Sequence, residues 1–343
     1  MRVLLTGHQG YLGTVMAPIL AEAGHQVTGL DSGLFASCVL GAEPEDPPGI
    51  PVDLREITLS HLSGFDAVIH LAALSNDPLG SLAPELTFDI NHRASVRLAR
   101  LARDAGVRRF LYASTCSVYG ASGGDDLLNE DAPLRPVTPY AESKVRVEDD
   151  LHALADVDFS PVYLRNATAF GFSPRLRTDI VLNNLVAHAL LSGVVLVLSD
   201  GTPWRPLVHA ADIAAAFAAA LVAPREYVHD TAFNVGTETN NLTVAEIANE
   251  VVAAVPDAEL RITGENGSDP RSYRVDFSRM RAATGFAARW TVADGAVELA
   301  DAYRRFGLTT ADFERRFTRL AWLSDRTDVG DIDAMLRPTK AVA

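Results

Sequence analysis

The chain has 343 residues, of which 48% are hydrophobic and 22% charged, a balance typical of a globular protein with one large and one smaller domain. Its net charge of −14 argues against general binding to nucleic acid or anionic membranes, because both require a basic surface. Cys38 and Cys116 are the only cysteines, which excludes a disulfide framework and a cysteine-based zinc site and favours the reducing cytoplasm.

Short runs of Val, Ile and Leu alternate with helical patterns through the first half of the chain. Strands are predicted at residues 3–7, 25–31, 66–73 and 108–114, and helices at 14–24 and 91–106. This alternation predicts an α/β fold with a Rossmann-type, doubly wound parallel sheet. A strand that begins so early disfavours a secretory leader. The acidic, proline-rich segment 43–51 is predicted to be a solvated connector.

Beyond residue 160 the order is less regular. Strands are predicted at 160–171 and 194–201, and helices at 210–222 and 242–256. The apolar stretch 213–222 falls well short of the ~20 residues that span a bilayer, so no membrane partner is expected. We predict a nucleotide-binding domain over 1–165 with returning pieces at about 205–235. A smaller α/β domain over 166–204 and 236–308 follows, and then a helical tail over 309–343 whose arginines line a solvated face.

The segment TGHQGYLG at 6–13 places Gly7, Gly10 and Gly13 between a strand and a helix. The first glycine permits a tight turn, the second lets a diphosphate approach the backbone, and the third lets helix and strand pack closely. Asp31 ends the next strand 24 residues after Gly7, where a carboxylate accepts from a ribose 2′-hydroxyl and repels a 2′-phosphate. The pattern predicts dinucleotide binding and favours NAD over NADP.

Tyr140 and Lys144 in PYAESK share one face of a predicted helix, since they are four residues apart. An ammonium beside a phenol stabilises the phenolate and lowers the pKa of the tyrosine, which makes it usable as a general base. Lys144 is one of only two lysines, because 28 of the 30 basic residues are arginine. A surface pair without chemistry is the alternative.

Taken together, these motifs resemble the extended short-chain dehydrogenase/reductases, in the group of nucleotide-sugar epimerases and dehydratases. The resemblance runs in order over about residues 1–300. It is carried by TGHQGYLG, Asp31, Asp53-Leu54, HLAA at 70–73, Asn91, STCSVYG at 114–120, YAESK at 140–144, Asn183-Asn184 and WRPLVHAAD at 204–212.

The resemblance implies three sets of site residues and no metal. The catalytic set is Thr115, Tyr140 and Lys144. Contacts to NAD are implied for Gly7, Gln9, Gly10, Tyr11, Leu12, Gly13, Asp31, Asp53, Leu54, Leu71, Ala72, Ala73, Asn91, Tyr140 and Lys144. Contacts to the nucleotide-diphosphate sugar are implied for Ser75, Asn76, Thr115, Cys116, Ser117, Thr168, Asn183, Asn184, Arg205, Arg271 and Arg274, with Arg205 and either Arg271 or Arg274 as diphosphate clamps.

Some of these assignments have structural alternatives. Thr168 stands where many relatives have asparagine, and Ser75 and Asn76 belong equally well to a structural turn. The arginines at 271 and 274 could be surface ion-pair partners. Cys116 has no motif-linked histidine to activate it as a nucleophile, and the alternation of side chains along a strand turns its thiol away from the sugar.

The residues after Thr115 select among the family's reactions. Similar dehydratases carry Asp-Glu directly after this hydroxyl residue, and decarboxylating relatives commonly keep a glutamate at the second position. Cys116 and Ser117 occupy these two positions here, which favours 4-epimerisation through a 4-keto intermediate. A dehydratase, decarboxylase or keto-sugar reductase is the alternative within the family, and a non-catalytic NAD-binding sensor is the alternative outside it. The sugar, whether hexose, heptose or uronic acid, cannot be identified from the sequence.

Apolar residues on two predicted helices bear on association. Val96, Leu98 and Leu101 lie on the helix at 91–106, and Val145, Val147 and Leu151 on a helix at 140–155. In the family that the chain resembles, such helices pair two subunits, which predicts a homodimer. Burial within one chain is the alternative explanation.

Overall fold

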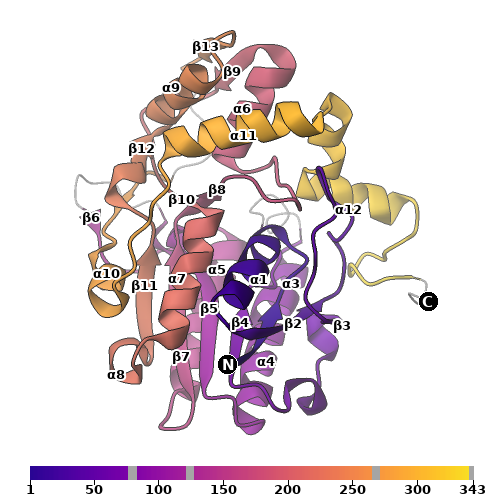
Figure 1. Ribbon diagram of the computed structural model, residues 1–343, viewed down its shortest axis with the longest axis vertical. Helices are drawn as coiled ribbons and strands as arrows, with labels where there is room; N and C mark the ends of the chain where they lie inside the picture. The colour runs from indigo at the N-terminus through magenta and orange to yellow at the C-terminus, as the bar shows by residue number, and fades with distance from the viewer. Residues whose placement is uncertain (76–82, 121–126, 265–270, 340–343) are drawn as a thin grey trace.

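The computed structural model describes residues 1–75, 83–120, 127–264 and 271–339 (Figure 1). Its central sheet has seven parallel strands in the order β11-β7-β5-β4-β1-β2-β3. They are β1 (Arg2–Thr6), β2 (Gln26–Asp31), β3 (Gly49–Pro51), β4 (Ala67–His70), β5 (Arg109–Thr115), β7 (Ser160–Asn166) and β11 (Thr231–Val235). The strand order reverses between β1 and β4, which confirms the predicted doubly wound sheet and places a ligand crevice at their carboxyl ends.

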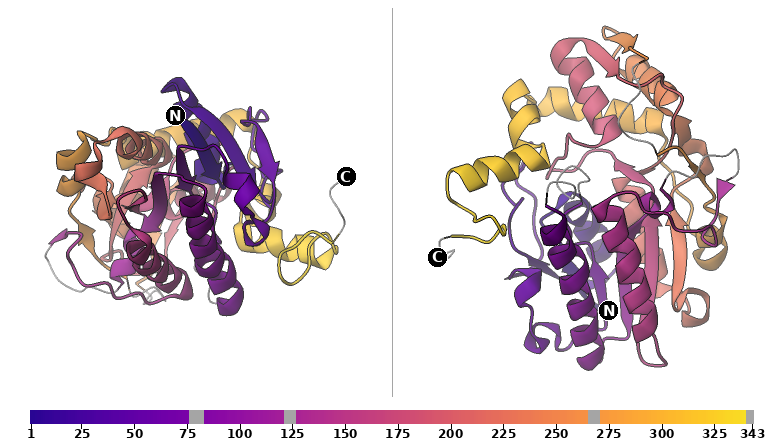
Figure 2. Two further views of the ribbon diagram at one scale, coloured as in Figure 1. Left: turned by 90° about the horizontal axis from the view of Figure 1, so that it is seen from below. Right: turned by 180° about the vertical axis from the view of Figure 1, so that it is seen from behind.

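Helices cover both faces of this sheet, which is why its central strands are apolar on both sides. Helices α1 (Tyr11–Glu22) and α7 (Ala210–Val222) pack together on one face, and α4 (Ala94–Asp104) and α5 (Pro139–Leu154) lie on the other (Figures 1 and 2). Pro139 is the first residue of α5, and the Thr138 side chain caps the helix by accepting from the Ala141 amide at 3.2 Å. The segment PYAESK therefore begins at a well-defined helix start.

A second core lies beyond the carboxyl ends of the strands, in the upper part of Figure 1. Its helices are α6 (Val181–Ser192), α9 (Val244–Ala254) and α11 (Val292–Phe306). Two small sheets accompany them, formed by β8 (Thr168–Phe170), β10 (Trp204–His209) and β12 (Asn241–Thr243), and by β9 (Val194–Val197) and β13 (Glu259–Ile262). A third small sheet, of β6 (Leu127–Leu128) and β14 (Arg274–Val275), packs against the core of the central sheet. The remaining helices are α3 (Pro84–Thr87), α8 (Arg225–Val228), α10 (Ser278–Thr284) and α12 (Arg319–Asp328).

Two predicted segments differ in the structure. Residues 49–51 of the predicted connector form the edge strand β3, and Asp46 in the same segment pairs with the buried Arg175 at 2.6 Å. The start of the predicted helix 91–106 belongs to a π-helical turn over Phe88–Arg93, and the rest of it forms α4, which ends at Asp104. Gly106 follows with a φ of +79°. The first difference arises from pairing with distant residues and the second from local backbone geometry, and composition encodes neither.

The apolar residues that suggested a subunit interface are mostly used inside the chain. Val96, Leu98, Val147 and Leu151 are buried within a single protomer, in the core between α4, α5 and the sheet. Intramolecular packing accounts for this part of the pattern, so the homodimer stays a prediction. Among the described residues, no helix combines the length and apolar character required to cross a membrane.

Candidate active site

The turn between β1 and α1 leaves no room for side chains. Gly7 has a φ of +75°, and a Cβ atom there would lie 2.8 Å from the Ala72 nitrogen. A Cβ atom on Gly13 would lie 2.2 Å from the Gly7 carbonyl oxygen. Gly10 is the N-cap of α1, and no side chain caps the helix, so the amides of its first turn face the cavity without a side-chain acceptor. This is the geometry that accepts a diphosphate.

Asp31 closes the neighbouring strand β2 and faces the same cavity. Its Oδ2 accepts from the Gln9 amide at 3.0 Å and its Oδ1 from the Gly33 amide at 2.9 Å. A carboxylate oxygen has lone pairs for more than one donor, so Asp31 can also accept from a ribose hydroxyl. Gln9 itself does not line the cavity, and its side chain binds Asp46 at 2.9 Å.

The cavity has a volume of about 460 Å³ and lies between the carboxyl ends of the central strands and the second core. Most of the predicted site residues are on its wall. They are Gly7, Gly10, Tyr11, Leu12, Gly13, Asp31, Asp53, Leu54, Leu71, Ala72, Ala73, Ser75, Thr115, Ser117, Tyr140, Lys144, Thr168, Arg205 and Arg271. The volume is typical of a cofactor or substrate site.

The predicted catalytic residues meet at one end of this cavity. Thr115 is the last residue of β5, and α5 carries Tyr140 and Lys144 beside it. Lys144 is buried, and its Nζ donates to the Ala113 carbonyl at 2.7 Å and lies 5.6 Å from the centroid of the Tyr140 ring. Burial lowers the pKa of Lys144 to about 7, and the charge of Glu148 opposes this shift. The Lys144 amine thus lies beside the phenol, as the spacing predicted.

A buried ion pair supports these residues from below. Glu148, one turn after Lys144, accepts from Arg165 Nη2 at 2.6 Å and from Arg165 Nε at 3.1 Å. It also accepts from the Ser114 hydroxyl at 2.5 Å, next to Thr115. Both charged side chains are only 7% exposed. Strands β5 and β7 and helix α5 are therefore tied together directly behind the reacting end of the cavity.

The predicted substrate contact of Cys116 is not found. Its thiol points away from the cavity and donates to the Arg165 carbonyl at 3.1 Å. Burial raises the pKa of this thiol, so it is not a reactive thiolate. Ser117, the next residue, does line the cavity and accepts from Arg271 Nη1 at 3.3 Å. The alternation of side-chain directions explains the difference.

Two of the three candidate arginine clamps line the cavity. Arg205 on β10 and Arg271 lie together, and Arg205 Nη1 donates to the Arg271 carbonyl. Arg274 instead stacks on Trp204, with its guanidinium carbon 5.0 Å from the ring centroid. Of the two alternatives at 271 and 274, the structure places Arg271 on the wall.

The sequence matches a known family of proteins. A model described as "NAD dependent epimerase/dehydratase family" matches residues 3–236, which include the glycine turn, Asp31 and the Tyr140/Lys144 pair. The chain belongs to the NAD-dependent epimerase/dehydratase family. NAD is accordingly its cofactor, and the uncapped start of α1 and the side-chain-free turn at Gly7 and Gly13 fit that dinucleotide.

Members of this family with different reactions are similar to the chain. A UDP-glucose 4-epimerase of Mycolicibacterium smegmatis is 30% identical over 317 residues, which cover 89% of this chain and 99% of the relative. A dTDP-glucose 4,6-dehydratase of Streptomyces niveus is 28% identical over 329 residues, covering 89% and 93%. The solved structure of MoeE5 in complex with UDP-glucose and NAD has a TM-score of 0.76 and 28% identity, covering 89% and 99%.

Three predicted family contacts hold the backbone and do not line the cavity. Asn91 accepts from the Leu74 amide at 2.7 Å and donates to the Leu74 carbonyl at 3.1 Å, which orders the turn after β4. Asn183 binds both the Gly171 amide and its carbonyl, and Asn184 donates to the Thr178 carbonyl at 3.0 Å. These asparagines shape the wall from behind. Asn76 lies outside the described residues.

Seven polar residues on the cavity wall were not predicted as site residues: Ser32, Arg55, Ser114, Asn166, Arg177, Asp179 and Arg319. Asn166 ends β7 in register with Thr115, and its buried Oδ1 has no partner among the described residues. Its place at the end of a parallel strand was the signal that could have revealed it. Arg177 and Asp179 come from an irregular segment, and Arg319 begins α12 in the predicted solvated tail; only the folded chain brings them to the cavity. The described residues contain no cluster of His, Cys, Asp and Glu suited to a metal ion.

The role of Asp31 can be tested by the substitution Asp31→Asn. We expect NAD to bind about tenfold to a hundredfold more weakly, because a charged hydrogen-bond acceptor is lost, and the preference over NADP to shrink. Titration of the protein with NAD and with NADP measures the two dissociation constants. Asp66→Asn, at an exposed carboxylate just before β4 and so at the amino-terminal end of the sheet, should change neither constant. An unchanged ratio of the NAD and NADP dissociation constants for Asp31→Asn would refute the assignment.

Proposed function

We propose that this protein epimerises a nucleotide-diphosphate sugar at carbon 4 and leaves its NAD unchanged. The proposal rests mainly on the residues that lie next to Thr115. The Thr115 and Tyr140 side chains line the cavity with Lys144, while the next two residues are a buried thiol and a hydroxyl in place of two carboxylates. The cavity thus holds the groups that oxidation and reduction of a sugar hydroxyl need, without the acid and base pair used for dehydration by the dehydratases that the sequence resembles.

The chain's own residues provide for proton transfer and orientation. Tyr140 takes the proton from the 4-hydroxyl and returns it when the opposite epimer forms. Lys144 stabilises the phenolate by its charge, and Thr115 orients the hydroxyl through its own. NAD supplies the hydride acceptor and donor. Because the hydride and the proton removed from the sugar are both returned to it, on the opposite face of carbon 4, no net oxidation occurs.

We assign the binding of the substrate's diphosphate to Arg205 and Arg271. Arg205 and Arg271 present guanidinium groups suited to paired contacts with a diphosphate. Ser117 and the unpartnered Oδ1 of Asn166 lie nearer to the catalytic strand ends and are proposed to contact sugar hydroxyls. The relatives named for UDP-glucose support a uridine nucleotide and a hexose as the first substrates to test.

A 4,6-dehydratase is the second candidate, because the cavity wall carries one further carboxylate. Asp179 is a carboxylate on the cavity wall that sequence reasoning did not identify. It is bound to Arg177 by two contacts, of 2.9 and 3.2 Å, which hold it as an ionised partner and leave it poorly suited to donate a proton. The dehydratase relative from Streptomyces niveus is nearly as similar as the epimerase relative.

A single assay separates these functions. Purified protein is incubated with UDP-glucose and then with a panel of nucleotide sugars, followed by NMR and mass spectrometry. We expect interconversion of two epimers of equal mass without net NADH formation. Loss of water would show the dehydratase, loss of carbon dioxide a decarboxylase, and stoichiometric NADH an oxidation. No turnover of any sugar, with NAD bound, would favour the non-catalytic sensor.

Two further properties complete the proposal. A homodimer is proposed by resemblance to the family, with α4 and α5 as the candidate interface, and the molar mass in solution tests it. A reducing cytoplasmic location is proposed from the two buried, unpaired cysteines, Cys38 and Cys116.

A further inference from the structure

An arginine of the C-terminal tail lies on the wall of the active-site cavity. Arg319 is the first residue of α12 and is only 4% exposed. The tail was predicted to place its arginines on a solvated face, and for Arg319 this prediction is wrong. The matched family region ends at residue 236, so this side chain is an addition from outside that region.

The guanidinium of Arg319 lacks the partners that a buried cation requires. Neither Nη1 nor Nη2 has a hydrogen-bond partner among the described residues. Its carbon lies 4.3 Å from the centroid of the Phe35 ring, which supports one face of the group. Burial lowers the pKa of Arg319 to about 10, with a smaller opposing effect from Cys38, so the group remains a cation at neutral pH. A buried, unpaired cation destabilises a protein unless an anion joins it.

The protein carboxylate near Arg319 does not neutralise it. Asp179 lies close enough to affect its pKa, but this carboxylate is held by Arg177 in a close ion pair. Arg177 also donates to the Ser75 hydroxyl at 3.0 Å and to the Ser75 carbonyl at 3.2 Å. The two arginines and one aspartate therefore leave one positive charge over, on Arg319, whose Nη1 and Nη2 have no hydrogen-bond partner among the described residues.

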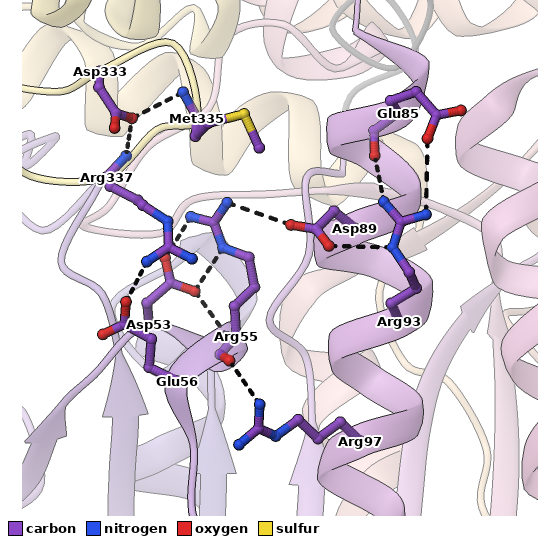
Figure 3. Close-up of polar contacts among 10 residues, drawn as sticks. All are labelled: Asp53, Arg55, Glu56, Glu85, Asp89, Arg93, Arg97, Asp333, Met335 and Arg337. Carbon is purple, nitrogen blue, oxygen red and sulfur yellow. Dashed lines mark hydrogen bonds and ion pairs between the residues drawn. The ribbon is translucent and has the colours of Figure 1, made fainter.

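Helix α12 holds this charge at the dinucleotide end of the cavity. Trp322 Nε1 donates to the Leu34 carbonyl at 2.9 Å, and Leu34 and Phe35 follow β2 and line the cavity with Asp31. Farther along the tail, Arg337 forms an ion pair with Glu56 beside Asp53 and Arg55, as Figure 3 shows. Figure 1 shows the tail returning from the second core toward the β2 and β3 side of the sheet.

We propose that Arg319 binds the diphosphate of NAD, so that the C-terminal tail completes the cofactor site. The start of α1 supplies amide donors to this group from the sheet side, and Arg319 supplies a fork of charged donors from the tail. The nucleotide sugar also carries a diphosphate, but Phe35 and Leu34 place Arg319 next to β2, where the adenosine half of a dinucleotide lies. The inference rests on the family's cofactor and is independent of the reaction proposed above.

The test uses the full-length protein freed of nucleotide and the substitution Arg319→Met, which keeps the length of the side chain and removes its charge. Calorimetric titration with NAD, ADP-ribose, adenosine and UDP-glucose separates the possible ligands. We expect NAD and ADP-ribose to bind about tenfold to a hundredfold more weakly, and adenosine and UDP-glucose to bind as before. Arg319→Lys keeps the charge but loses the fork, and should lie between the two.

Arg326→Met is the matched control on the same helix, because Arg326 is solvent-accessible and pairs with Asp331 at 3.2 Å. It should leave all four affinities unchanged. The Tm of the nucleotide-free Arg319→Met protein should equal or exceed that of the parent, since an unpaired buried charge is removed, while NAD should raise it less. Three results would overturn the proposal: unchanged NAD affinity, weakening confined to UDP-glucose, or a large loss of Tm without nucleotide. Failure of epimerisation alone would not affect it.

Discussion

The substitution Tyr140→Phe is expected to reduce kcat for epimerisation by about a thousandfold, with little effect on the affinity for NAD. The phenol is proposed as the only group that exchanges a proton with the sugar hydroxyl, and a positioned general base typically contributes 10² to 10⁴ in rate. Phenylalanine keeps the ring beside Lys144, which lies 5.6 Å from its centroid. NMR measurement of sugar interconversion, with NAD titration on the same sample, tests both parts.

Tyr227→Phe is the control for this result, because Tyr227 is 57% exposed on the short helix α8. It should leave kcat unchanged. If Tyr140→Phe retained more than about a tenth of the parent rate, the base would have to be another residue. Asp179, which shares the cavity wall with Tyr140, would then be the first group to test.

The substitution Glu148→Gln is expected to lower the free energy of unfolding by about 3–5 kcal/mol. Glu148 neutralises Arg165 in a setting where both side chains are 7% exposed, and an amide of the same size cannot replace its charge. The cation would then be buried without compensation. The Ser114 hydroxyl would also lose its carboxylate acceptor behind Thr115. Urea denaturation followed by fluorescence and circular dichroism measures the change.

Glu142→Gln provides a matched control on the same helix. Glu142 pairs with Arg146 one turn away, but the two side chains are 45% and 48% exposed. Solvent screens such a pair, so its loss should cost no more than about 0.5 kcal/mol. If both variants lowered stability by the same small amount, the buried pair would contribute no more than a surface pair.

Several parts of the site could be predicted because their signals are local in sequence. Gly7 and Gly13 are required by atoms of their own turn or of the adjoining strand end, so the glycine pattern alone indicates the turn. Tyr140 and Lys144 are four residues apart in an α-helix, so their side chains are neighbours wherever the helix lies in the fold. Asp31 could be placed because strand ends of a parallel sheet share one edge.

Other assignments failed where the same kind of residue serves the backbone or the core. Asn183 and Asn91 match the family's order, yet their side-chain amides bind main-chain groups of Gly171 and Leu74, 12 and 17 residues earlier in the chain. Cys116 follows the catalytic threonine, but the strand ends there and its thiol turns into the core. Buried polar side chains must find partners, and those partners are set by the fold.

The sequence by itself therefore determined the doubly wound sheet, the dinucleotide turn and the Tyr140/Lys144 pair, because each depends on spacing within one or two elements. The tertiary structure alone decided that Arg319 leaves the solvent and lines the cavity. The mixed charges of this helix predict an exposed face when only the sequence is considered. Arg319 is buried because α12 packs against Leu34 and Phe35, nearly three hundred residues earlier in the chain. Desolvation and pairing of charge are properties of such long-range contacts, and local patterns do not contain them.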